Sequence, residues 1–356
     1  MKYGYQLLKG LGAHFKNPKF LIGFLIIFGM LVVSVAHSII QEEPVRQYVL
    51  VYDEDGGLVS SKPHPPSKYV PMGSDLLGYS IMDQLITGAK YTILFASGIA
   101  LLRMLVGFLF AIPYVFLLSN KWRKMFEKVV DSFHYLPLTV LALVLLAPLI
   151  MGSTTGFEYS FTERILVQGL ILTILVVPLL TVLIGNEMRL ILEKEFITGA
   201  RVLGASNRQI IKKHVMPHLS ARLGLIFGQQ FIQVLVLLIH LGLFGLFLGG
   251  TSVMYDEFYK SPPHSVTFEW SGLISNTREA FMTGYYWIVV PVFLAFIIVI
   301  ISMQLIVEGI QEVQQRRIGV GIKCSRSIRS LFRRKNKPKE SSVKELTVKP
   351  EDFHFL

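Results

Sequence analysis

The sequence predicts an all-α, polytopic membrane protein with six transmembrane helices. Of its 356 residues, 52% are hydrophobic and only 17% are charged, whereas soluble domains average about 25% charged residues. The apolar residues gather in long runs, and most basic residues stand between the runs. The formal net charge of +11 therefore indicates loops at a membrane surface and not a nucleic-acid-binding face.

Six segments are long and apolar enough to span a membrane. Crossing a hydrocarbon core of about 30 Å takes about 20 mostly apolar helical residues. The segments lie near residues 20–40, 91–119, 134–152, 163–186, 222–248 and 284–309. The first is interpreted as a membrane helix and not as a cleavable signal, because Ala36-His37-Ser38 leads into no small-x-small cleavage site.

The charges of the loops predict the orientation. With the N-terminus placed in the cytoplasm, the inner segments carry 26 Lys and Arg residues and the outer segments carry 7. Without the C-terminal tail the inner count is still 14. The positive-inside rule then predicts a multi-pass plasma-membrane protein with both termini in the cytoplasm.

These spans divide the chain into five regions. The predicted regions are a cytoplasmic N-terminus (1–19), a first transmembrane helix (20–40), an extracellular segment (41–90), a permease-like core of five helices (91–309) that contains a cytoplasmic loop (188–219), and a basic cytoplasmic tail (310–356). The tail has few large apolar residues after Phe332, so it cannot bury enough surface to fold alone and is expected to be partly disordered. Attraction to anionic inner-leaflet lipid and docking to a cytoplasmic partner are both open for it.

The extracellular segment is too polar to lie in lipid. Residues 47–52 have the composition of a strand, 53–57 that of a turn and Leu58-Val59 that of a second strand. A small β-hairpin and a plain tether between two helices both remain open, because an isolated two-stranded hairpin is only marginally stable.

The loop at 188–219 has an internal pattern. Apolar residues recur there at Ile197, Ala200, Val202, Leu203, Ile210 and Ile211. This spacing predicts two short amphipathic helices, with Gly204 at the break between them. Ser206 is placed to cap the second helix, and Pro217 to set the boundary before the next span. Such a helix–Gly–helix platform on a cytoplasmic face predicts contact with another protein.

This loop resembles the signature loop of binding-protein-dependent ABC importer permeases, whose pattern is Glu-Ala-Ala, three residues, Gly, nine residues, Ile-x-Leu-Pro. Gly204 and Pro217 stand at the required separation, and residues 200–206 look like the version in the dipeptide/oligopeptide/nickel branch. The loop departs from that version at Thr198 and Gly199, where the branch has Glu and Ala, and at Met216, where it has Leu.

Other stretches resemble the same family in the same order. Residues 71–78 are similar to its Pro-Leu-Gly-Thr-Asp stretch before the second span, with Tyr79-Ser80 in place of an Arg-Asp pair. Residues 131–137 resemble the start of its third span, and residues 269–287 resemble its terminal section. Together the resemblance covers residues 15–315.

The resemblance implies one permease subunit of an ATP-driven importer that translocates peptides by alternating access. A permease for nickel or another small solute, and a non-transporting scaffold or sensor derived from a permease, are the alternatives. Coupling to an ATPase is implied for Glu195, Thr198, Gly199, Ala200, Arg201, Gly204, Ala205, Ser206 and Pro217.

The resemblance also implies partners. These are a second homologous permease subunit, two ABC ATPase subunits and an extracellular substrate-binding protein, together with the lipid membrane and no nucleic acid. The segments 73–88 and 249–283 are candidates to meet the binding protein.

The chain is not expected to be an enzyme. It lacks the Gly-x-x-x-x-Gly-Lys-Ser/Thr phosphate cradle, so no cofactor is expected on this chain, and ATP and Mg are expected on partner subunits. No Ser/His/Asp, paired-carboxylate or metal constellation supports an intramembrane enzyme. An ion-gradient carrier would predict inverted repeats and interrupted helices, and neither is clear in the sequence.

Two polar residues inside predicted spans are candidates for the solute pathway. Arg103 falls mid-span, where a charge costs at least about 2.5–3.5 kcal/mol unless it is paired or hydrated. A structural pair with a neighbouring helix and a place in the pathway are both open for it. His240 is interpreted as a packing or interfacial residue and not as a metal ligand, because no second ligand stands at metal-binding spacing. Glu187 and Arg189 could pair, position the loop, or remain unpaired and solvated.

Overall fold

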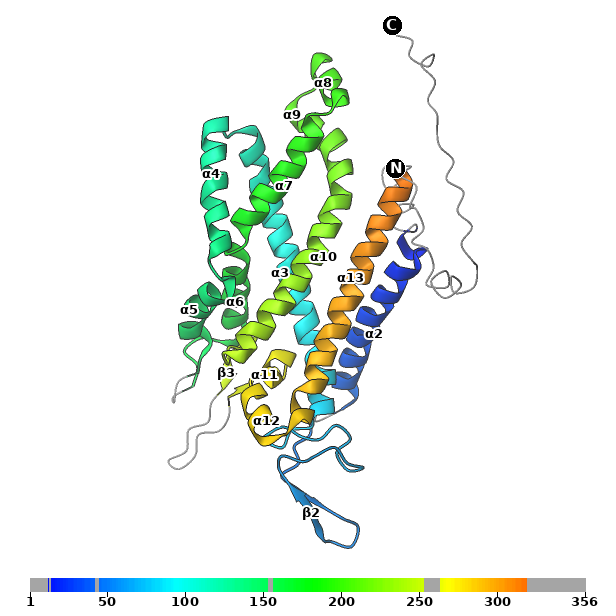
Figure 1. Ribbon diagram of the computed structural model, residues 1–356, viewed down its shortest axis with the longest axis vertical. Helices are drawn as coiled ribbons and strands as arrows, with labels where there is room; N and C mark the ends of the chain where they lie inside the picture. Colours follow the sequence, from blue (N-terminus) through cyan, green and yellow to red (C-terminus); the bar gives the residue numbers. More distant parts are fainter. Residues whose placement is uncertain (1–11, 13, 42–44, 153–155, 253–262, 319–356) are drawn as a thin grey trace, which may run out of the picture. The chain divides into compact units, whose positions relative to one another are not determined.

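A computed structural model describes residues 12, 14–41, 45–152, 156–252 and 263–318, and within them the protein is all-α with two small two-stranded sheets (Figure 1). The α-helices are α2 Pro18–Ile40, α3 Ile81–Phe116, α4 Asn120–Ser132, α5 Leu138–Ile150, α6 Phe161–Ile174, α7 Val177–Leu192, α8 Glu195–Val202, α9 Asn207–Ile210, α10 Met216–Leu243, α11 Trp270–Ile274, α12 Thr277–Thr283 and α13 Val290–Ile318. The shorter elements are the 3-10 turns η1 Phe133–Tyr135 and η3 Tyr286–Ile288, the π turn η2 Ile211–Val215, and the strands β1 Leu50–Tyr52, β2 Leu58–Ser61, β3 Thr251–Ser252 and β4 His264–Ser265.

Contacts divide the chain into two units, residues 1–314 and 315–356. Of the second unit the structure describes residues 315–318, which form the last turn of α13. The basic tail predicted beyond them lies outside the described residues.

Four helices are long and apolar enough to cross a membrane: α2, α3, the Arg222–Leu243 part of α10, and α13 with the turn before it. A multi-pass, all-α membrane protein is thus confirmed. The second helix starts earlier than the predicted residue 91, because Ser80 caps it and its hydroxyl oxygen accepts a hydrogen bond from the Asp83 N–H at 3.3 Å. Residues 81–90 are therefore helical and not part of the polar segment.

The predicted span at 163–186 is not one straight helix. It is the pair α6 and α7, bent by 48°. Pro178 has no N–H to donate to the Ile174 carbonyl, so the α-helical ladder cannot continue across this point. Just before this point, the Val176 N–H donates to the Thr173 carbonyl at 3.1 Å and not to its α-helical partner, the Leu172 carbonyl. An interrupted helix, which the sequence did not make clear, is therefore present.

The predicted span at 134–152 is also shorter than expected. Its helix, α5, has 13 residues, which corresponds to about 20 Å and is less than the hydrocarbon thickness of about 30 Å. Pro137 precedes it and separates it from η1 and the amphipathic helix α4. In the part of the chain that the structure describes, the number of full-length spans is therefore four, or five if α6 and α7 count as one.

The centre of the bundle is the packing of α3 against α7, α10 and α2 (Figure 1). Glycines allow the closest approaches: a Cβ on Gly107 of α3 would lie 2.8 Å from the Leu180 Cβ of α7. A Cβ on Gly23 of α2 would collide with the Ser302 carbonyl oxygen of α13. Small residues of this kind are typical of helix contacts in membranes, where backbones approach closely.

The polar segment before α3 contains the hairpin and is not a plain tether. Strands β1 and β2 pair antiparallel, with Leu50 opposite Ser61 and Tyr52 opposite Leu58. The buried imidazole of His64 bonds to both sides of the hairpin. Its Nε2 atom lies 2.9 Å from the Tyr48 carbonyl oxygen, and its Nδ1 atom lies 2.6 Å from the Ser60 hydroxyl oxygen. This added contact explains how so small a hairpin is held.

Candidate functional site

The predicted loop platform lies at the end of the bundle opposite the β1–β2 hairpin (Figure 1). Helix α8 ends at Val202, and Gly204 reverses the chain with a φ of 82°, a left-handed conformation that glycine adopts without steric cost. Ser206 then caps α9 as predicted: its hydroxyl oxygen accepts from the Gln209 N–H at 3.3 Å, and the Gln209 side chain accepts from the Ser206 N–H at 3.0 Å.

The second loop helix is not a separate element, which corrects the sequence prediction. Pro217 stands at the start of α10, but α9, η2 and α10 follow one another without an intervening coil. The π turn η2 lies immediately before the proline, where the α-helical ladder loses one donor. The platform is therefore joined rigidly to α10.

The inner face of the platform is anchored in the bundle. Ile197 of α8 and Ile210 of α9 are fully buried and belong to the same apolar cluster as Ile184 of α7 and Tyr114 of α3. The Phe196 ring stacks on the His218 ring with centroids 5.5 Å apart. A force applied to α8 would consequently reach α3, α7 and α10.

The tip of the platform is apolar and uncovered. The side chains of Val202 and Leu203 are 83% and 88% exposed. Val202 and Leu203 were not among the predicted coupling residues. Of those that were, Glu195, Thr198, Gly199, Arg201, Gly204, Ser206 and Pro217 are exposed, and Ala200 and Ala205 are half-buried. An apolar tip with a polar rim is typical of a protein–protein contact.

A stripe of exposed residues, four polar and two apolar, follows one face of α10, and we call it the polar stripe. Its members are Arg222, Gln229, Gln233, Val236, His240 and Leu243. The exposed face of α2, in contrast, consists of apolar side chains such as Leu25, Phe28 and Val32, which suit lipid. Glutamine side chains in the middle of a membrane helix, such as Gln229 and Gln233, face water or protein, because lipid offers them no hydrogen bonds. His240 lies in the last turn of the same helix.

Part of this stripe forms one wall of an open groove of 420 Å³. The other walls come from α5 and from the break between α6 and α7. The groove is lined by Phe133, Leu136, Leu138, Thr139, Leu141, Leu175, Val176, Leu179, Ile232, Gln233, Val236, Leu237 and His240. Three of these thirteen residues carry polar side chains, and the Thr139 hydroxyl oxygen lies 3.1 Å from the His240 Nδ1 atom. His240 is thus exposed at the groove, in contact with α5.

Arg103 is fully buried and does not reach the groove directly. Its Nε and Nη2 atoms donate to the Leu172 carbonyl oxygen at 2.9 and 2.6 Å. That carbonyl is available because the Val176 N–H, its usual helical partner, bonds to the Thr173 carbonyl instead. Arg103 also donates through Nη1 to the Gln230 Oε1 atom at 3.4 Å, and the Gln230 Nε2 atom donates to the Gln233 Oε1 atom at 3.0 Å.

A second, more polar cavity of 490 Å³ lies between α4 and α7. Glu127, Asp131 and Arg189 are among its lining residues. Arg189 Nη1 lies 3.9 Å from Glu127 Oε1, whereas Glu187 pairs with Arg222 of α10 at 2.7 Å. Glu187 and Arg189 are therefore both paired, but each with a residue on another helix.

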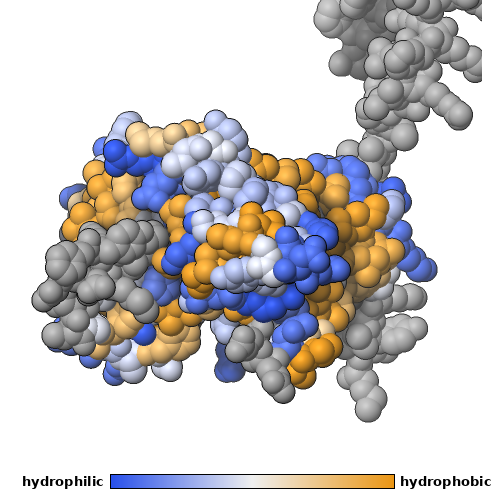
Figure 2. Space-filling view, turned by 90° about the horizontal axis from the view of Figure 1, so that it is seen from below, coloured by the Kyte–Doolittle hydropathy of each residue, from blue (hydrophilic) through white to orange (hydrophobic). Residues whose placement is uncertain are grey.

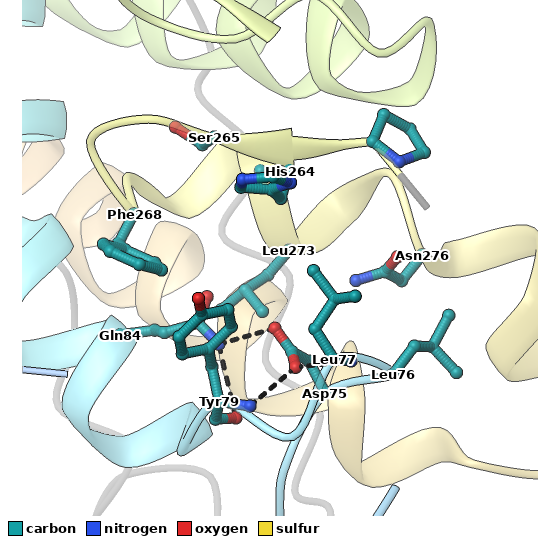
Figure 3. A pocket seen from close by; sticks show the side chains of 12 residues that line it. Asp75, Leu76, Leu77, Tyr79, Gln84, His264, Ser265, Phe268, Leu273 and Asn276 are labelled. Atoms are coloured by element: carbon teal, nitrogen blue, oxygen red, sulfur yellow. Dashed lines mark hydrogen bonds between the residues drawn. The ribbon is translucent and has the colours of Figure 1, made fainter. Parts of the chain in front are cut away.

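The two segments expected to meet a binding protein lie side by side at the hairpin end of the bundle. Asp75 stands at the centre of a small polar pocket together with Tyr79 and Gln84, while His264 and Asn276 form its opposite side (Figure 3). Hydrophilic residues cover much of this end, with hydrophobic residues along its flanks (Figure 2). Residues 253–262 of the second segment lie outside the described residues.

Asp75 is held by hydrogen bonds, and no salt bridge to it occurs among the described residues. Its carboxylate accepts from the N–H groups of Leu77 and Tyr79 at 3.0 and 2.9 Å and from the Gln84 side chain at 2.8 Å. Burial raises the pKa of Asp75, although these hydrogen bonds act in the opposite direction. The buried Glu269, which caps α11, has a raised pKa for the same reason.

Several residues of these sites were not singled out from the sequence. Thr139 and Gln233 come together only after α5 and α10 have packed, and Gln230 meets Arg103 only after α10 has packed against α3. A helical-wheel reading of α10 would have placed Gln229, Gln233 and His240 on one face, which was the available signal. No group of three or more potential metal ligands occurs among the residues that the structure describes.

Comparison with known proteins identifies the family. Residues 103–320, more than half of the chain, match the family described as the binding-protein-dependent transport system inner membrane component. A protein of Brucella suis, provisionally named a peptide transport system permease protein, is 21% identical over 72% of this chain and 76% of its own length. A Brucella melitensis protein of the same name is 20% identical over 71% of this chain and 76% of its own. The chain therefore belongs to the inner-membrane permease family of binding-protein-dependent ABC importers.

Proposed function

We propose that this chain is one permease subunit of an ATP-driven importer that carries peptides across the plasma membrane by alternating access. Family membership supplies the permease role. The peptide substrate is supported by the names of the Brucella relatives and by the resemblance of the loop to the peptide/nickel branch.

The platform of α8 and α9 carries the ATP-driven part of the proposal. It presents two exposed apolar side chains, Val202 and Leu203, on a short helix whose inner face is buried in the bundle. A pair of ATPase subunits that covers this tip, one on each permease, would move α8, and the buried Ile197 would transmit that movement to α7. ATP and Mg would then be bound by the ATPase subunits and not by this chain.

The polar stripe of α10 supports a translocation path outside the single subunit. Because a stripe containing Gln229, Gln233 and His240 is unsuited to lipid, we place it at the interface with a second, homologous permease subunit, where water and solute would pass. The segments that meet around Asp75 would then face an extracellular binding protein, and both termini would lie in the cytoplasm. The excess of Lys and Arg in the loops on the α8 side supports this orientation.

Uptake by the reconstituted complex tests the proposal. The two permeases, the ATPase chains and the binding protein would be reconstituted in vesicles and supplied with radiolabelled tri-alanine, with and without ATP. We expect ATP-dependent uptake that is abolished by Gly204→Val, because a β-branched residue cannot hold a φ of 82° without strain. Gly204→Asn is the matched control, because Asn tolerates this conformation and a Cβ at Gly204 would meet nothing within 4 Å.

Two results would contradict the proposal. Tri-alanine uptake that does not depend on ATP would argue against an ATP-driven importer. Normal uptake by Gly204→Val would exclude the platform as the coupling element. A complex that binds its ATPase chains but moves neither tri-alanine nor longer peptides would favour the scaffold or small-solute alternatives.

A further inference from the structure

The groove between α5, the α6–α7 break and α10 is lined by apolar side chains with three polar groups, and none of its lining residues is Asp, Glu, Lys or Arg. Its 420 Å³ lies within the range of about 300–1,000 Å³ that is usual for small-molecule sites. A pocket of this composition suits an uncharged, partly polar segment.

The direction of the hydrogen bonds behind the groove fixes which polar atom faces into it. The Arg103 guanidinium can only donate, so the Gln230 side-chain oxygen must be turned toward it. The Gln230 side-chain nitrogen then points to the next turn of α10, where it donates to the Gln233 side-chain oxygen at 3.0 Å. With its oxygen engaged in this way, Gln233 presents its amide nitrogen, a donor, at the groove.

We infer that this groove is a peptide-binding subsite within the membrane, in which the Gln233 amide N–H donates to a backbone carbonyl oxygen of the solute. Thr139 and His240, on the same lining, supply further polar contacts, and the leucine and valine side chains receive an uncharged side chain of the peptide. Arg103 and Gln230 are positioning residues, because they orient Gln233 and line no part of the groove. This inference rests on the proposed peptide transport and assigns it a site.

Substrate protection of an introduced thiol tests the subsite without relying on uptake. The chain has a single cysteine, Cys324, so Cys324→Ser gives a thiol-free background. Val236→Cys would place a thiol inside the groove, and Leu243→Cys would place one on the same exposed stripe outside it. Each variant, in the assembled transporter, would be labelled with a water-soluble maleimide at increasing concentrations of tri-alanine.

We expect tri-alanine to protect the thiol at 236 and not the thiol at 243. Adding Gln233→Leu should raise the tri-alanine concentration for half-protection about three- to tenfold, which is the effect of one lost neutral hydrogen bond. Gln229→Leu, the same change on the same face of α10 but outside the groove, should shift it less than twofold. Gln230→Met removes the orienting bond while keeping the side-chain length, so it should also raise the tri-alanine concentration for half-protection. Combined with Gln233→Leu, it should raise that concentration little further.

The acceptor on the solute can be varied as well. A thioamide analogue of tri-alanine, whose sulfur is a weaker acceptor than a carbonyl oxygen, should protect less well than tri-alanine in the native background. The Gln233→Leu variant should no longer distinguish the two peptides.

Different failures have different meanings. If tri-alanine is taken up but protects neither thiol, or if Gln229→Leu and Gln233→Leu have equal effects, the subsite is wrong and the importer stands. Cross-linking of the thiol at 236 to the second permease without any protection would make the groove a subunit contact. If uptake is absent but tri-alanine protects the thiol at 236, the proposed transport fails while the binding groove remains.

Discussion

At the scale of single residues, Arg103 shows how a charge is accommodated inside a membrane helix. The helix break leaves the Leu172 carbonyl without its helical donor, and the Arg103 Nε and Nη2 atoms donate to it at 2.9 and 2.6 Å. The sequence predicted that Arg103 would be either paired or hydrated, because a charge at this depth is otherwise costly. It could not predict a backbone carbonyl as that partner, since the carbonyl becomes available only through the break before Pro178.

Arg103→Leu should destabilise the protein by about 1–3 kcal/mol, because it removes the donors to the buried Leu172 carbonyl and to Gln230. Thermal unfolding in detergent measures the loss. Arg222→Leu is the control: its pair with Glu187 is half exposed, and such pairs contribute about 0–1 kcal/mol. An unchanged melting temperature together with normal uptake for Arg103→Leu would exclude both roles proposed for this residue.

Glycine at position 199 weakens α8 without a packing reason. No heavy atom lies within 4 Å of the place where its Cβ would be. Gly199→Ala, which also restores the residue of the peptide/nickel branch, should therefore stabilise α8 by about 0.5–1 kcal/mol. The assembled complex should show a small rise in melting temperature.

The matched control for that variant is Gly107→Ala, where the new Cβ would lie 2.8 Å from the Leu180 Cβ. This change should lower the melting temperature through overpacking. A stabilising effect at Gly107, or a destabilising one at Gly199, would contradict the packing described for these two glycines.

At the scale of elements, the breaks in α6–α7 and before α5 decide where the groove lies. Hydropathy located both apolar segments, because a long apolar run is visible in any sequence window. It treated each as one helix, since hydropathy alone does not mark a break, and membrane helices tolerate prolines such as Pro178 and Pro137. Whether a helix breaks at such a proline depends on the neighbouring helices, because they supply other partners for the backbone groups that are left without a hydrogen bond.

The element before α3 gives a pH-dependent prediction. Burial raises the pKa of Asp75, so the folded protein holds this proton more tightly than the unfolded chain. The stabilisation is complete below the ordinary pKa of about 3.9 and is lost as the pH rises through the raised folded-state pKa. Tyr79, Gln84 and His264 line the same pocket.

Asp75→Asn should therefore reduce the fall in melting temperature between about pH 4 and pH 7, because an amide stays neutral throughout. Its carbonyl oxygen can still accept from the Leu77 and Tyr79 N–H groups. Glu54→Gln, in the exposed hairpin turn, is the control. A steeper pH dependence in Asp75→Asn than in the native protein would show that Asp75 is ionised at low cost in the folded state.

At the scale of the whole molecule, the sequence predicted the class of fold, the loop platform and the family, and it did so through patterns local in the chain. The Gly204 reversal and the Ser206 cap depend on residues within four positions of each other. The groove does not, because Thr139 and His240 are 101 residues apart and meet only when α5 packs against α10. Local signals thus located the platform better than the groove.

The whole account depends on the apolar tip of α8 being covered by an ATPase subunit. Leu203→Asp places a charge on that tip, while Leu117→Asp makes the same change at a side chain that is 79% exposed at the C-terminal end of α3, outside the loop 188–219. The most direct measurement is the amount of ATPase that co-purifies with the detergent-solubilised protein. The account predicts that Leu203→Asp lowers the amount of co-purified ATPase at least about tenfold, as expected when an interface anchor is lost. Leu117→Asp should leave that amount unchanged. Full retention by Leu203→Asp, or equal loss in both variants, would contradict it.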